Sequence, residues 1–206
     1  MANTLYQDDL PDGLDLGDCV AIDCETMGLN LQRDRLCLVQ LSGGDGNAHL
    51  VQIAAATGAA AAAPNLRALL ADPECTKLFH FGRFDIAALH RHFGVLATPV
   101  YCTKIASKLV RTFTDRHGLR DLCRDLLAVD LSKQQQTSDW GAPELTQAQI
   151  SYAARDVLYL HALRAKLDDM LEREGRAALA EACFSFLPHR ALLDLAGWPD
   201  QDIFAH

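Results

Sequence analysis

Four acidic residues in three separate segments could together carry out metal-dependent chemistry. Asp23 and Glu25 lie two residues apart in the apolar segment CVAIDCE. Asp85 follows in HFGRFD, and Asp156 ends the segment YAARD. Carboxylates gathered from distant segments can hold a pair of divalent cations, which is a general arrangement for cleaving phosphodiesters. Oxygen ligands favour hard ions, so we expect two divalent cations, Mg²⁺ or Mn²⁺, rather than zinc.

The segment around Asp23 and Glu25 has the brevity and apolar character of a buried strand. Residues i and i+2 of a strand face the same side of a sheet, so both carboxylates would project into one space. Their repulsion would be costly there without a cation between them. The alternative is a strand end that enters a solvated acidic turn, because Thr26, Met27 and Gly28 follow directly.

Tyr152 and Asp156 belong to a segment, residues 146–167, whose apolar residues recur at the spacing of a helix. Thr146 is a suitable N-cap for that helix. Because positions i and i+4 are neighbours on a helix face, a phenol and a carboxylate are presented together, about one turn apart. The alternative is a core tyrosine beside an exposed acid. We expect Asp85 to lie at the start of another helix. The alternative is that it has no catalytic role and is an acid that the helix dipole favours at that position.

Taken together, these segments resemble the DEDD exonucleases, and within them the ribonuclease D-like branch that has tyrosine in its third motif. The resemblance covers about residues 19–167. The matching residues, in chain order, are Asp23, Glu25, His80, Gly82, Asp85, Tyr152 and Asp156. The histidine subtype would need His at position 151, where Ser151 stands, so the tyrosine subtype fits better. One departure is Phe81, at a position that is often small or polar in relatives.

The resemblance implies a metal-dependent 3′-5′ exoribonuclease that hydrolyses phosphodiesters from the 3′ end of RNA, trims that end and releases 5′-nucleoside monophosphates. Its catalytic residues would be Asp23, Glu25, Asp85, Tyr152 and Asp156. The first two and Asp156 would bind one metal ion. Asp23 would bridge to a second, whose water shell involves Asp85. Tyr152 would orient the attacking water, because a tyrosine pKa of about 10 makes it a poor base at neutral pH.

The partner that the resemblance implies is the 3′ end of a single-stranded nucleic acid, with RNA favoured. Thr26, Met27 and Leu29 resemble the family's grip on the terminal nucleotide. Apolar side chains can stack beneath a base without reading its identity. Lys133 is a candidate phosphate contact. The alternatives are ordinary packing for Met27 and Leu29 and a solvated surface lysine at position 133.

Two other functions stay open at this point. A DNA 3′-5′ exonuclease would use the same metal chemistry, and no motif identifies the contacts to the 2′-hydroxyl group that would discriminate RNA from DNA. A noncatalytic nucleic-acid-binding module would result if the carboxylates did not converge. The oligomeric state is also open, because the sequence does not separate packing within one chain from packing between chains.

The elements that must position these residues alternate along the chain. Residues 19–25, 35–42 and 47–53 are apolar or alternating, have short connections and predict three antiparallel strands. Further strands are expected near 77–81 and 99–102, in alternation with helices, which implies parallel addition to the sheet. We therefore expect an α/β fold with a mixed five-stranded sheet flanked by helices, similar to the ribonuclease H-like architecture that the family resemblance implies.

Half of the 206 residues are hydrophobic, which is enough for one substantial core. We expect a single exonuclease domain, residues 1–206, with a core at about 19–170 and C-terminal helices at about 171–206 that pack on it or on a partner. The net charge of −8 argues mildly against a nucleic-acid partner. A stripe of basic residues between 104 and 124, with Arg111 among its members, weakens that argument. The stripe either guides a nucleic-acid strand or is an ordinary solvated face.

The sequence also bears on location. No apolar run reaches membrane-spanning length, and the acidic N-terminal segment lacks the features of a signal peptide. Seven cysteines are scattered without a Cys-x-x-Cys pair, which disfavours a disulfide framework and a zinc site. We therefore expect a cytoplasmic protein without membrane association. Strand alternation should turn Cys24, which lies between two proposed ligands, toward the core.

Overall fold

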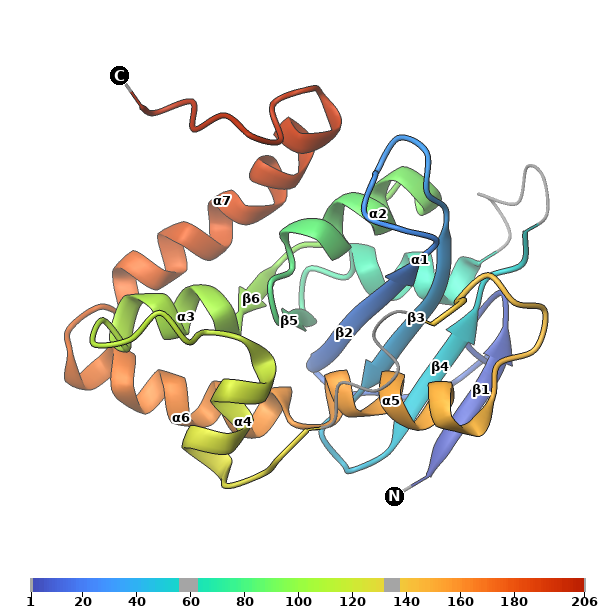
Figure 1. Ribbon diagram of the computed structural model, residues 1–206, viewed down its shortest axis with the longest axis horizontal. Coiled ribbons are helices and arrows are strands. Elements are labelled where there is room, and N and C mark those ends of the chain that lie inside the picture. The colour runs from blue at the N-terminus through green and yellow to red at the C-terminus, as the bar shows by residue number, and fades with distance from the viewer. Residues whose placement is uncertain (1, 56–62, 132–137, 206) are drawn as a thin grey trace.

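The computed structural model describes residues 2–55, 63–131 and 138–205. Its central element is a mixed sheet of six strands (Figure 1). The strands are β1 (Asn3–Gln7), β2 (Cys19–Thr26), β3 (Leu36–Ser42), β4 (Ala48–Gln52), β5 (Thr76–Phe79) and β6 (Val100–Cys102). Their order in space is β1-β4-β3-β2-β5-β6. Strand β3 is antiparallel to β2 and β4, whereas β1, β5 and β6 join the sheet in parallel.

The predicted mixed α/β architecture is confirmed, but the sheet has six strands where five were expected. The additional strand is β1, which runs parallel to β4 with Asn3 opposite Ala48. Its residues are exposed or half-buried, because β1 lies at the edge of the sheet. It therefore lacks the apolar run that marks the inner strands, and its partner is too distant in the sequence for a local pattern to indicate the pairing.

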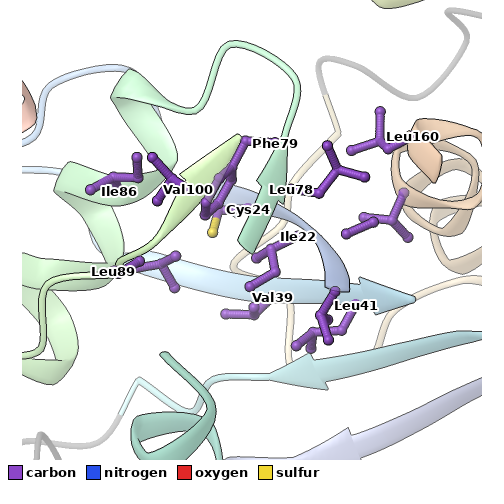
Figure 2. Close-up of a cluster of buried hydrophobic side chains, with 14 of the residues drawn as sticks. Ile22, Cys24, Val39, Leu41, Leu78, Phe79, Ile86, Leu89, Val100 and Leu160 are labelled. Carbon is purple, nitrogen blue, oxygen red and sulfur yellow. The ribbon is translucent and has the colours of Figure 1, made fainter. Parts of the chain in front are cut away.

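Helices flank both faces of the sheet (Figure 1). They are α1 (Pro64–Ala71), α2 (Arg83–Phe93), α3 (Thr103–Val110), α4 (Leu119–Leu127), α5 (Gln147–Leu158), α6 (Leu160–Arg173) and α7 (Ala177–Leu195). Helix α5 packs against β1 to β4, and α2 packs against β2 and β3 from the other side. Figure 2 shows part of the apolar core, with Ile22 and Cys24 of β2 beside Ile86 and Leu89 of α2.

The helix predicted over residues 146–167 is two helices. Helix α5 ends at Leu158 and α6 begins at Leu160, with Tyr159 between them. The segment contains neither glycine nor proline, so its sequence does not mark the break. The break lets α5 stay on the sheet while α6 packs against α3 and α4.

The expected C-terminal helices are one long helix, α7, which continues through Pro188 and packs on α2 and β6. Near its end, the buried Asp194 carboxylate accepts two hydrogen bonds of 2.6 Å from Arg83 of α2. It also forms an ion pair with Arg190 at 2.8 Å. These contacts fix α7 on the helix that carries Asp85. Among the described helices, none combines the length and the apolarity needed to cross a bilayer.

Candidate metal centre and active site

Strand β2 carries Asp23 and Glu25 on one face and Cys24 on the other. Cys24 is buried in the apolar core, as strand alternation predicted. In the neighbouring strand β3, Gln40 lies opposite Asp23, and its Nε2 donates a hydrogen bond of 3.2 Å to Asp23 Oδ2. Because Gln40 is fully buried, it fixes the orientation of the Asp23 carboxylate.

Helix α5 positions the tyrosine and the last carboxylate. It begins with a capping box, in which Thr146 Oγ1 accepts a hydrogen bond from the Gln149 backbone N–H and Gln149 Oε1 accepts one from the Thr146 N–H. The predicted N-cap is therefore confirmed. Tyr152 and Asp156 follow on one face of the helix. The Tyr152 ring packs against the buried Trp140, with the ring centroids 6.1 Å apart.

Three of the carboxylates converge. Oxygens of Asp23, Glu25 and Asp156 lie within 4.8 Å of one another and form a group able to hold a metal ion. Asp85 lies outside this trio, in the first turn of α2, and is buried. Its Oδ1 accepts a hydrogen bond of 3.1 Å from the Cys24 backbone N–H, which ties α2 to β2 beside the trio.

Burial and mutual repulsion raise the pKa values of these carboxyl groups. Burial, followed by the charges of Asp156 and Asp85, raises the pKa of Glu25 to about 8. Burial raises the pKa of Asp85 and that of Asp156 to about 7 each. Burial and then the neighbouring carboxylates raise the pKa of Asp23 well above its ordinary range. The free site therefore resists carrying four negative charges.

The donor set fits a hard divalent cation. In residues 2–55, 63–131 and 138–205, no lysine, arginine or histidine forms an ion pair with any of the four carboxylates. Carboxylate oxygens are the ligands that Mg²⁺ and Mn²⁺ prefer, and a cation among them would relieve the repulsion that raises their pKa values.

The four carboxylates and Tyr152 line one pocket of about 550 Å³, which is within the size range of small-molecule sites. Thr26 and Leu29, two of the residues predicted to bind substrate, line it as well. Leu29 is 86% exposed and Met27 is 53% exposed, so neither is an ordinary core side chain. Met27 is close by in sequence but does not line the pocket. Lys133 lies outside the described residues.

The pocket also contains side chains that sequence reasoning did not place there. Phe81, Phe84 and Arg120 all line it. The sequence signals Phe81 only as a departure from the family pattern and Arg120 only as part of a basic stripe. Phe84 carries no sequence signal beyond its position next to Asp85. These three residues come together with the carboxylates only through the packing of α2 and α4 around the pocket.

His80 stands beside the carboxylates without the properties of a proton carrier. Its Nδ1 shares a hydrogen bond of 2.8 Å with Thr103 Oγ1. Burial, followed by the charge of Lys104, lowers the pKa of His80 to about 3, so the ring is neutral at neutral pH. His80 therefore joins the end of β5 to the start of α3.

The basic stripe is not a uniform guiding surface. Arg111 is buried, and its guanidinium pairs with Asp125 at 2.6 Å. Arg124 pairs with the same carboxylate at 2.9 Å. Arg111 therefore neither guides a strand nor faces solvent, which corrects both interpretations of this residue. Helical spacing alone could not reveal that the segment leading to α4 covers this side of α3.

The chain is similar to known exonucleases in sequence and in overall structure. The sequence profile described as 3′-5′ exonuclease matches residues 8–172. Ribonuclease D of Granulibacter bethesdensis is 38% identical over 159 residues, which are 77% of this chain and 39% of that protein. The chain thus spans about two fifths of the length of these curated ribonuclease D relatives.

Solved structures of Brucella melitensis NrnC match the whole chain. The structure with bound Mg²⁺ is 56% identical, covers 100% of both chains and has a TM-score of 0.94. The structure bound to pGG is 58% identical, covers 98% of this chain and 97% of that chain, and also has a TM-score of 0.94. With its carboxylates and tyrosine gathered at one pocket, this chain belongs to the DEDD family of 3′-5′ exonucleases, in the ribonuclease D-like branch.

Proposed function

We propose that the protein is a metal-dependent 3′-5′ exoribonuclease that removes 5′-nucleoside monophosphates from the 3′ end of single-stranded RNA. The observation that carries this proposal is the meeting of Asp23, Glu25 and Asp156 within 4.8 Å, in a pocket that also holds Asp85 and Tyr152. Carboxylates from separate segments that share one open pocket suit phosphodiester hydrolysis better than simple binding.

In this proposal, Asp23, Glu25 and Asp156 would hold one divalent cation, and Asp23 and Asp85 would serve a second. Bound there, the cations would activate the attacking water and stabilise the departing 3′ oxygen. Mg²⁺ in the related NrnC structure supports magnesium as one ion that this donor set accepts. Gln40 and the Cys24 backbone N–H each donate a hydrogen bond to one oxygen of Asp23 and of Asp85, respectively, and so preset the directions of both carboxylates.

Tyr152 is assigned an orienting role. Burial, followed by the charges of Asp156, Glu25 and Asp23, raises the pKa of the Tyr152 phenol above its ordinary value. The hydroxyl therefore stays protonated at neutral pH and cannot serve as the base. It retains a proton and lone pairs with which to hold a water molecule in line with the phosphate.

The terminal nucleotide is placed against Thr26, Met27 and Leu29. The exposure of Met27 and Leu29 supports this assignment, because an apolar side chain left in solvent near a polar site gains by covering a base. Lys133 remains a proposed phosphate contact. The pGG ligand of NrnC supports a short single-stranded substrate, and a pocket of about 550 Å³ has room for a small ligand rather than a duplex.

We also propose that residues 1–206 act as a single exonuclease domain in the cytoplasm. The packing of α7 on α2 supports the first point. All seven cysteines are unpaired, which suits a reducing compartment and supports the second.

Matched single-stranded RNA and DNA oligonucleotides, labelled at the 5′ end and incubated with Mg²⁺ or Mn²⁺, test the function directly. The proposal predicts stepwise shortening from the 3′ end, release of 5′-nucleoside monophosphates and faster cleavage of RNA. Preferred cleavage of the DNA strand would favour the DNA exonuclease alternative. No cleavage of either strand would contradict the proposal.

A further inference from the structure

A single exposed aromatic residue, Phe81, stands at the corner between β5 and α2. It lines the same pocket as the carboxylates and is 49% exposed. Its backbone is in the left-handed region, with φ of 64°. A bulky residue adopts this conformation at an energetic cost, and such strained positions cluster at ligand sites. The packing of the core gives no reason for a large aromatic side chain at this strained corner.

The corner is rigid. A Cβ atom at position 82 would collide with the Phe79 side chain, so the chain needs Gly82 there. The His80 ring is bonded to Thr103 at the start of α3. These contacts hold the backbone of residue 81 in one conformation, from which its ring points outward into the pocket.

A cation already lies on one face of this ring. The Lys104 ammonium is 3.9 Å from the Phe81 ring centroid, within the range of a cation–π contact. Lys104 covers one face of the ring and brings positive charge to this side of a pocket that also holds four carboxylates. An aromatic platform next to a basic side chain is the combination by which proteins hold single-stranded nucleic acid without reading its sequence.

We propose that Phe81, backed by Lys104, forms a stacking subsite for the nucleobase on the 5′ side of the scissile phosphate. This inference rests on the proposed function. The base of the departing terminal nucleotide is assigned to the loop after β2, at Leu29. Strand β5 runs parallel to β2 and directly beside it but ends earlier, so the corner after β5 lies level with Asp23 and Glu25 of β2. Leu29, from the loop after β2, lines the same pocket as Phe81. The two loops therefore offer one platform to each of two successive bases.

Hydrolysis of two RNA substrates tests the subsite. One is a 5′-phosphorylated dinucleotide, and the other is its analogue in which hydrogen replaces the base on the 5′ side of the scissile bond. On the intact dinucleotide, Phe81→Leu should lower kcat/KM by about 5- to 150-fold, the range observed when an aromatic partner of a base is removed. The loss should appear as a higher KM with little change in kcat, because the stacking contact is present in the ground state as well as in the transition state.

The analogue closes a double-mutant cycle. If Phe81 holds the missing base, Phe81→Leu should change kcat/KM for the analogue by no more than about 2-fold. Phe81→Trp, which keeps an aromatic face, should retain nearly wild-type kcat/KM on the intact substrate. The matched control is Phe113→Leu, because Phe113 is 78% exposed and also has an arginine near its ring but lies outside the pocket. It should leave both substrates unaffected.

An equal loss on both substrates, or no loss on the intact one, would overturn the subsite. Equal melting temperatures for wild type and Phe81→Leu would show that a loss does not come from misfolding. Failure of the proposed function gives a different result, because the wild-type protein would then hydrolyse neither substrate with Mg²⁺ or Mn²⁺.

Discussion

The charge of Glu25 should make the metal-free protein lose stability as the pH rises. Burial and the neighbouring carboxylates raise the pKa of Glu25 from its ordinary 4.5 to about 8 in the folded protein. Between these values the folded state binds a proton that the unfolded state has released. The free energy of unfolding therefore falls as the pH rises, because a rise in pH favours the state that binds fewer protons, which here is the unfolded one.

The size of the effect follows from the two pKa values. At pH 6 the folded Glu25 is almost fully protonated, at pH 8 it is half ionised, and the unfolded residue is ionised at both. Glu25 alone should then lower the free energy of unfolding by about 2 kcal/mol between pH 6 and pH 8. For a chain of this length that corresponds to a fall of about 4–8 °C in melting temperature. Asp85 and Asp156, with pKa values of about 7, add to this fall in the wild type.

The buried His80 opposes this trend. Burial lowers its pKa to about 3, so the folded ring stays neutral while the unfolded one takes up a proton below its ordinary pKa of 6.5. Its contribution to stability is fully present above pH 6.5 and declines as the pH falls below that value. The informative quantity is therefore the difference in the free energy of unfolding between wild type and Glu25→Gln, because the contribution of His80 is the same in both and cancels.

Chelator-treated wild type and Glu25→Gln should be unfolded with urea at pH 6 and at pH 8. From pH 6 to pH 8, the free energy of unfolding of the variant should rise by about 2 kcal/mol relative to that of wild type. Added Mg²⁺ should reduce this gain, because the cation stabilises the ionised wild-type site and has one ligand fewer in the variant. A gap that stays constant with pH would refute the electrostatic description of the site.

Further substitutions test other parts of the account. Tyr152→Phe should lower kcat by about 100-fold or more while leaving Mn²⁺ affinity unchanged, and undiminished turnover would remove Tyr152 from the mechanism. Gln40→Leu should weaken Mn²⁺ binding, measured by calorimetry, by about 10- to 100-fold, because the amide no longer orients Asp23. Asp194→Ala should lower the free energy of unfolding by about 2–4 kcal/mol, because Arg83 and Arg190 both lose their buried partner. The side chain of Arg83 is partly exposed, which limits the loss. A loss below about 1 kcal/mol in urea unfolding would show that the cluster behaves as a surface ion pair.

Local signals in the sequence predicted the parts of the site that depend on local structure. The alternation in β2 placed Cys24 in the core, and the capping residue Thr146 marked the start of α5. Each local motif alone left a non-catalytic alternative open, and the resemblance of the ordered motifs to the DEDD exonucleases selected the acidic side chains that converge. The geometry within 4.8 Å depends on packing between strands and helices, which no single segment encodes.

The features that the sequence did not reveal are tertiary. Strand β1 pairs with a strand far along the chain, and its half-exposed residues give only a weak pattern. Arg111 has the spacing of a surface stripe but is buried against Asp125, because spacing does not say what covers a helix face. Phe81 is recognisable as a pocket residue only once its left-handed backbone and its contact with Lys104 are known.

The central claim is that Asp23, Glu25, Asp85 and Asp156 together hold two divalent cations. Anomalous diffraction from crystals of the protein with Mn²⁺ and a slowly cleaved phosphorothioate dinucleotide tests it most directly. The account predicts two manganese peaks among these four carboxylates, with the phosphorothioate between them, and loss of at least one peak in Asp156→Asn. Manganese bound elsewhere, or no peak among the four carboxylates, would contradict it.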